Sequence, residues 1–90
     1  MNLDSKNPSD ESIRTELIEA ILDYIEGRKN LKYVLAIGIT AHSKAVKNPN
    51  IAQVASELNQ MGNQTANGIK FSTETIRETF TTMLEKLTQG

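Results

Sequence analysis

Apolar residues recur at the spacing of an α-helix along most of this chain, and this periodicity constrains the fold more than any other feature. Placed 100° apart, five residues of the segment 9–27 share one face: Ile13, Leu17, Ala20, Ile21 and Tyr24. Ile18, Leu22 and Ile25 widen the apolar arc to about 200°. One neighbouring helix cannot cover such an arc. We therefore expect these last three residues to contribute to a homodimer interface.

The segment 31–47 reads at first as a strand, since YVLAIGIT is rich in β-branched residues. A helical wheel nevertheless places most of its apolar residues on one half and its polar residues on the other. The pattern predicts a helix, and a short buried strand at 33–39 is the alternative. His42 falls at the centre of the apolar arc, so we expect it to be a buried core residue.

Capping residues divide the rest of the chain. Asn48 is a helix cap with Pro49 at the first helical position, and Ser72 caps a last helix. Ser9 and Gly27 bound the first helix. The sequence therefore predicts an all-α domain of four helices near 9–27, 31–47, 49–61 and 72–88. The last helix carries this core stripe: Ile76, Phe80, Met83, Leu84 and Leu87.

The composition excludes several classes of protein. Ninety residues form one domain, which we place at 9–90 after a disordered tail at 1–8. There is no cysteine and one histidine, so we expect no disulfide, no metal site and no cofactor. No stretch approaches the roughly 18 apolar residues of a membrane span, and the polar start is not a secretory signal. A cytoplasmic protein without a membrane partner is expected.

Charge is segregated along the chain although the net charge is only −1. Residues 1–27 carry −5, residues 28–47 carry +5 without any acid, and residues 48–90 carry −1. A contact between the acidic and basic thirds, within the chain or across a dimer, explains this pattern. A phosphate-facing strip in the middle third explains it equally well.

The polar join between the last two helices, 62–71, is the feature that most suggests a function. Two amphipathic helices with a glycine-containing connector are the ingredients of a helix-turn-helix. Asn67-Gly68 is a strong hairpin signal, so the join could form a small two-stranded ribbon. On this reading, 9–47 is a helical pair used for dimerisation and 48–90 is the helix-turn-helix.

The segment VASELNQMGNQTANGIKFSTETIRETF, residues 54–80, resembles the helix-turn-helix of the DNA-binding "recombinase" domain of large serine recombinases. That family's pattern is approximately A-x-x-L-N-x-x-G-x-x-T-x-x-G-x-x-W-S-x-x-T-V-x-x-x-L. The chain follows it without a gap at Ala55, Leu58, Asn59, Gly62, Thr65, Gly68, Phe71, Ser72, Thr75, Ile76 and Phe80. Phe, Ile and Phe replace the Trp, the Val and the last Leu. The resemblance implies a module that reads duplex DNA, without the family's separate catalytic domain.

No constellation of catalytic residues is readable, so we expect no enzyme. The predicted function is that of a small DNA-binding regulator or accessory factor of a phage, plasmid or other mobile element. Its DNA contacts are predicted at Gln64, Thr65, Asn67, Lys70, Ser72, Thr73, Thr75, Arg77, Lys44 and Lys47. Glu74, Glu78 and Glu85 on the last helix oppose this role, because carboxylates repel phosphates. The alternative is a helical scaffold that binds a protein partner instead of DNA.

Overall fold

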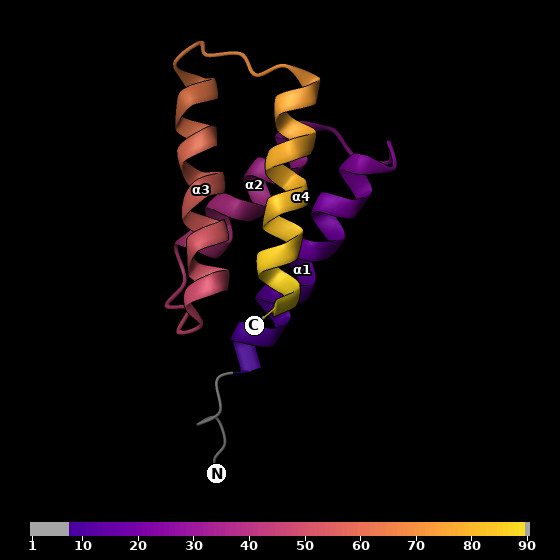
Figure 1. Cartoon of the computed structure of the whole chain (residues 1–90). Coiled ribbons are helices and arrows are strands. Elements are labelled where there is room, and N and C mark those ends of the chain that lie inside the picture. The colour runs from indigo at the N-terminus through magenta and orange to yellow at the C-terminus, as the bar shows by residue number, and fades with distance from the viewer. Residues whose placement is uncertain (1–7, 90) are drawn as a thin grey trace.

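The computed structural model describes residues 8–89, and the regular structure in this range is entirely helical (Figure 1). Helix α1 spans Pro8–Ile25, α2 Leu31–His42, α3 Pro49–Ala66 and α4 Thr73–Gln89. The predicted all-α fold with four helices is confirmed. The tail predicted at 1–8 lies outside the described residues, apart from Pro8, which begins α1.

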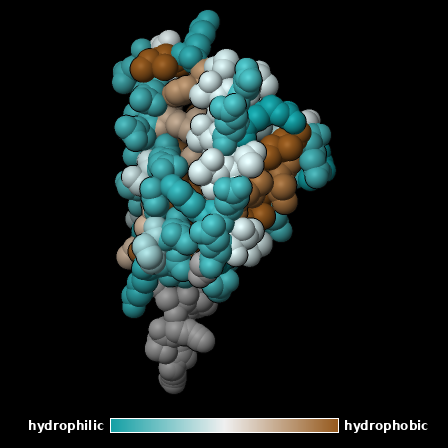
Figure 2. Space-filling view, in the orientation of Figure 1, coloured by the Kyte–Doolittle hydropathy of each residue, from teal (hydrophilic) through white to brown (hydrophobic). Residues whose placement is uncertain are grey.

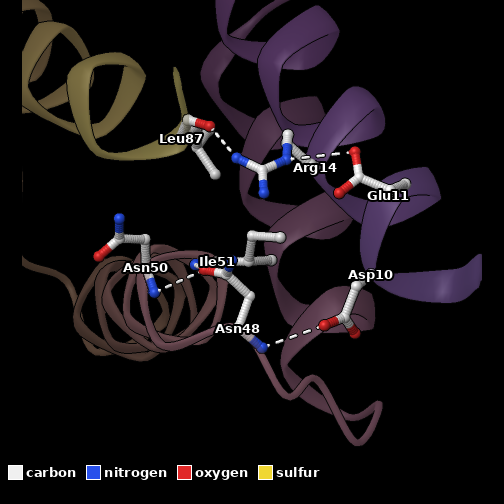
Figure 3. A network of polar contacts seen from close by, with 7 residues as sticks. All are labelled: Asp10, Glu11, Arg14, Asn48, Asn50, Ile51 and Leu87. Carbon is white, nitrogen blue, oxygen red and sulfur yellow. Dashed lines mark hydrogen bonds and ion pairs between the residues drawn. The ribbon is translucent and has the colours of Figure 1, made fainter. Parts of the chain in front are cut away.

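The four helices form an up-down-up-down bundle, in which neighbours in the sequence run antiparallel (Figure 1). Arg14 near the start of α1 donates a hydrogen bond to the carbonyl of Leu87 at the end of α4 (Figure 3). Lys86 in the last turn of α4 lies 3.4 Å from the carboxylate of Glu57 in the first half of α3. Helices α2 and α4 occupy opposite corners and make no close contact.

The core is apolar and follows the predicted stripes. Phe80 is fully buried in its centre, and its ring meets that of Tyr24 edge-on with centroids 5.3 Å apart. Helix α1 contacts all three other helices, which explains its wide apolar arc. Ile18 and Ile25 are half-buried against the core, whereas Leu22 is 38% exposed. Most of the arc is therefore covered within the chain.

Helix α2 ends at His42, five residues before the predicted boundary. The backbone N–H groups of Lys47 and Asn48 donate to the carboxylate of Asp10 in α1, at 3.0 Å for Asn48 (Figure 3). This contact joins the segment that precedes α3 to the start of α1. The prediction of a buried His42 was wrong, because the side chain is exposed where the helix ends.

Two glycines in the left-handed region end α1 and α3. Gly27 has φ +84°, and the N–H of Arg28 donates to the carbonyl of Asp23 in a Schellman motif. Gly68 has φ +93° and ends α3 in the same way. Asn67-Gly68 is thus a helix terminus. The predicted ribbon at 62–71 was wrong: α3 continues to Ala66, no strand occurs within residues 8–89, and only 67–72 connect α3 to α4.

The face of the molecule seen in Figure 2 is mostly hydrophilic, with a few apolar areas. On this face, apolar atoms gather on the right of the view, over α1, and at the top, near the α3–α4 connector. Leu22 of α1 and Ile69 of the connector are 38% and 47% exposed. Neither area is hollowed. Since no helix in the described range is long and apolar enough, none could cross a membrane.

Candidate functional site

The connector end of the bundle gathers most of the residues predicted to contact DNA. Eight of them lie between the last turn of α3 and the second turn of α4, and all but the half-buried Gln64 are exposed: Gln64, Thr65, Asn67, Lys70, Ser72, Thr73, Thr75 and Arg77. Lys70 and Arg77 form no ion pair with a described residue. These two side chains supply the positive charge that would attract a phosphate to the connector end of the bundle.

Several hydroxyls at this end already have structural partners. The N–H of Thr75 donates to Oγ of Ser72 at 3.1 Å, so Ser72 caps α4 as predicted. The hydroxyl of Ser72 lies 2.9 Å from that of Thr75, and the hydroxyl of Thr65 donates to the carbonyl of Met61 at 2.8 Å. A nucleic acid would therefore compete with these bonds.

The structure does not bring Lys44 and Lys47 to this site. Both lie in the segment that precedes α3, whereas the connector follows it (Figure 1). The 18 residues of α3 span about 27 Å at the rise of an α-helix. Helices α3 and α4 also pack as an antiparallel hairpin, whereas the two helices of a DNA-binding helix-turn-helix cross at about 90–120°. The ten predicted contacts thus do not form one continuous surface.

A groove between α2 and α3 is lined mainly by apolar and small side chains. Helix α2 lines it with Leu31, Leu35 and Ile39, three apolar side chains one turn apart. Helix α3 lines it with the small residues near its end: Gly62, Thr65 and Ala66. Lys32 and Ala36 complete the lining, and the groove encloses about 410 Å³. Ile39 remains 43% exposed there, so the bundle leaves a large apolar side chain uncovered.

The groove also has a distinctive electrostatic setting. Between Gly27 and Thr73, which includes both helices that line it, the chain contains a single acid, Glu57. That carboxylate pairs with Lys86 of α4, on the side of α3 that faces away from α2. By contrast, α1 and α4 carry the other acids of the described chain: Asp10, Glu11, Glu16, Glu19, Asp23, Glu74, Glu78 and Glu85, with Glu26 following α1. The basic residues of the middle third thus lie mostly on either side of α2, which itself contains only Lys32, whereas α4 carries three acids and two bases.

Not every cation of the middle third is available to a ligand. Arg28 donates hydrogen bonds to Asp23 and forms an ion pair with Glu26, and these contacts raise the pKa of its guanidinium above the ordinary value. Lys29 lies over the ring of Tyr33, 4.8 Å from its centroid. Lys32 and Lys44 form no ion pair with any residue of 8–89. Among the residues that the structure describes, Lys32 therefore lines the groove without an ion-pair partner.

Neither the connector end nor the groove, both of them within the described residues, contains a cluster of side chains that could bind a metal ion. Within residues 8–89, no group of three or more acidic or histidine side chains lies close enough together to hold a metal ion. Comparison of the chain with protein-family models, curated proteins and solved structures gives no match. The function must therefore be argued from the geometry of the chain itself.

The groove was missed at the sequence level. The wheel assigned Leu31, Leu35 and Ile39 to one apolar half of the second helix, which is also the pattern of a fully buried stripe. Only the packing shows that Ile39 is left exposed. The small residues opposite it, Gly62 and Ala66, gave no signal, because the sequence placed them in the irregular join.

Proposed function

We propose that this protein is a non-catalytic protein-binding module whose docking surface is the α2–α3 groove. The observation that carries this proposal is the open apolar groove, in which the side chain of Ile39 stays 43% exposed. Burial of apolar surface is the main source of affinity between proteins. The alternative derived from the sequence, a helical scaffold for a protein partner, thus becomes the leading interpretation.

A small-molecule site is less well supported by the same groove. Its volume lies in the range of about 300–1,000 Å³ that is usual for ligand sites, so this class has to be weighed. Such sites hold their ligands with a few converging polar groups. Here the polar groups are Lys32 and Thr65, and the hydroxyl of Thr65 is bonded to its own helix. Little would orient a small ligand.

A peptide selection tests this function with a matched pair of variants. Peptides selected on the parent protein from a displayed random library should bind Ala36→Glu at least about tenfold more weakly, because the new carboxylate lies in the groove. Ala45→Glu makes the same change at an exposed residue outside the groove and should leave binding unchanged. If no peptide is enriched, or if both variants bind like the parent, the groove is not a docking surface.

Duplex DNA remains the second candidate ligand, with the protein then acting as a regulator or accessory factor of a mobile element. Its support is the recombinase-like pattern of residues 54–80, together with the unpaired cations Lys70 and Arg77 at the connector end. Glu74 and Glu78 are exposed on α4, the helix that carries Arg77, and their carboxylates would repel the DNA phosphates. This candidate therefore predicts weak binding that depends steeply on salt.

The DNA candidate is tested with single substitutions at the connector end. Binding to random-sequence duplex DNA should weaken in Arg77→Ala and Lys70→Ala, with a salt slope lower by about one unit for each lost phosphate contact. Glu78→Gln should strengthen binding, because it removes a carboxylate from the same helix. Equal binding by the parent and all three variants would exclude α4 as the reading element, and no binding at low salt would exclude DNA.

A homodimer through α1 completes the proposed function. Leu22 is the exposed apolar residue of the predicted interface, and Ile18 and Ile25 flank it half-buried. The parent should sediment as a dimer, and Leu22→Glu should shift it to the monomer because it buries an unpaired charge. Thr81→Glu, on the exposed surface of α4, is the control. A monomer mass for the parent down to micromolar concentration would contradict this prediction.

A further inference from the structure

We propose that the α2–α3 groove binds an acidic amphipathic helix of a partner protein. This inference rests on the proposed function and specifies the partner's chemistry. Three observations carry it: the one-turn spacing of the apolar residues on α2, the helical backbone that forms both walls of the groove, and the positive charge of Lys32 in its lining.

The spacing of the groove residues matches the spacing of a helix. Leu31 and Ile39 lie eight positions, or about 12 Å, apart along the axis of α2, with the buried Leu35 between them. The facing wall is low, since Gly62 has no side chain and the Cδ1 of Ile39 lies 3.0 Å from where a Cβ would stand. An incoming helix can therefore place apolar side chains at i, i+4 and i+7 into the trough between the two walls.

An extended peptide does not suit this groove. Extended segments usually dock by adding a strand to a sheet edge, and residues 8–89 contain no strand. The middle of the groove, at Leu35, Ala36 and Gly62, is formed by helix interiors, where the N–H and C=O groups are paired along the helix. The backbone of an extended peptide would lose its bonds to water there without replacement. A helical partner satisfies its own backbone and needs only side-chain contacts.

The charge of the walls selects an acidic partner. Lys32 lies in the groove lining without an ion-pair partner among the described residues. The only acid of α3, Glu57, is already paired with Lys86. Carboxylates beside the apolar stripe of the partner would meet Lys32, whereas lysines there would be repelled. Complementarity of this kind determines the choice of partner and the association rate.

The composition of the selected peptides tests the partner's chemistry. Peptides that depend on the groove, as judged by loss of binding to Ala36→Glu but not to Ala45→Glu, should carry an apolar stripe at helical spacing flanked by Asp and Glu. A synthetic peptide of this kind should bind the parent protein about tenfold more tightly at low salt than the same peptide with Lys in place of each acid. Lys32→Glu, at an exposed position, should remove this preference.

The other possible results would overturn either the acidic helical partner or the groove as a docking surface. If groove-dependent peptides have neutral or basic flanks, or lack helical spacing, the proposed function stands and the acidic helix is wrong. If no peptide depends on the groove, the proposed function and the acidic helical partner are both wrong. If Ala36→Glu instead lowers the sedimenting mass of the protein alone, while Ala45→Glu does not, the groove is filled by a second copy of this chain, and a separate partner is excluded.

Discussion

Replacing Phe80 with alanine is expected to lower the free energy of unfolding by about 3–5 kcal/mol. The ring is fully buried between α4 and α1, where it meets Tyr24 edge-on, so the substitution leaves a cavity that the bundle cannot readily close. A domain of this size has only about 5–15 kcal/mol of stability to lose. Urea denaturation followed by far-ultraviolet circular dichroism measures the change.

The neighbouring residue provides the control. Thr81 is exposed, and its hydroxyl donates to the carbonyl of Arg77 in its own helix. Thr81→Ala should change the free energy of unfolding by no more than about 0.5 kcal/mol. If Phe80→Ala were as mild as Thr81→Ala, the register of α4 against the core would be incorrect.

The second large effect is expected at Gly38, where α2 crosses α3 most closely. A Cβ at this position would stand 2.3 Å from the Cβ of Leu58, and that atom cannot rotate away because it is bonded to the backbone. Gly38→Ala gains about 1 kcal/mol of helix propensity, but it forces the two helices apart. We expect a net loss of about 1–3 kcal/mol, the usual cost of overpacking a core.

Gly62→Ala is the matched control, since it adds the same methyl group to a second helical glycine. The nearest atom is the Cδ1 of Ile39 at 3.0 Å, which is the flexible end of a half-exposed side chain and can move aside. We expect Gly62→Ala to be neutral or to gain up to about 1 kcal/mol in the same urea titration. Equal effects of the two substitutions would mean that α2 and α3 are not in close contact at Gly38.

Local signals were sufficient to predict most of the fold. Asn48-Pro49, Gly27 and Ser72 each lie at the helix boundary that their chemistry predicts, because a cap acts through residues two or three positions away. The buried residues of α4 repeat the predicted stripe. Such features need no knowledge of the rest of the chain.

The predictions from the sequence were wrong at places where contacts with residues distant in the chain accompany the local structure. The carboxylate of Asp10 accepts from the N–H groups of Lys47 and Asn48, a contact between residues 37 and 38 positions apart that no helical wheel includes. Gly62 was taken for the end of a helix, although its lack of a side chain serves the contact with Ile39. The Asn67-Gly68 pair carries the same residue signal for a hairpin turn and for a helix terminus, and the packing of α3 selects the terminus.

The candidate site was predictable only in part. The sequence located the exposed polar residues of the connector, from Asn67 to Thr75, because turn formers and helix caps are locally encoded. It could not separate them from Lys44 and Lys47, since the length of α3 decides that distance. It also could not show that Ile39 is left exposed. The balance between a protein partner and DNA therefore depends on the tertiary structure.

The most direct test of the central claim is a backbone amide NMR titration of the isotope-labelled protein. The two probes are a peptide from the selection and a random-sequence DNA duplex at moderate salt. The account predicts that the peptide shifts the amides of 31–39 and 62–66, which line the groove, and that the duplex causes little change. Saturating shifts at 67–77 with the duplex, without peptide shifts in the groove, would contradict it and identify a DNA-binding protein instead.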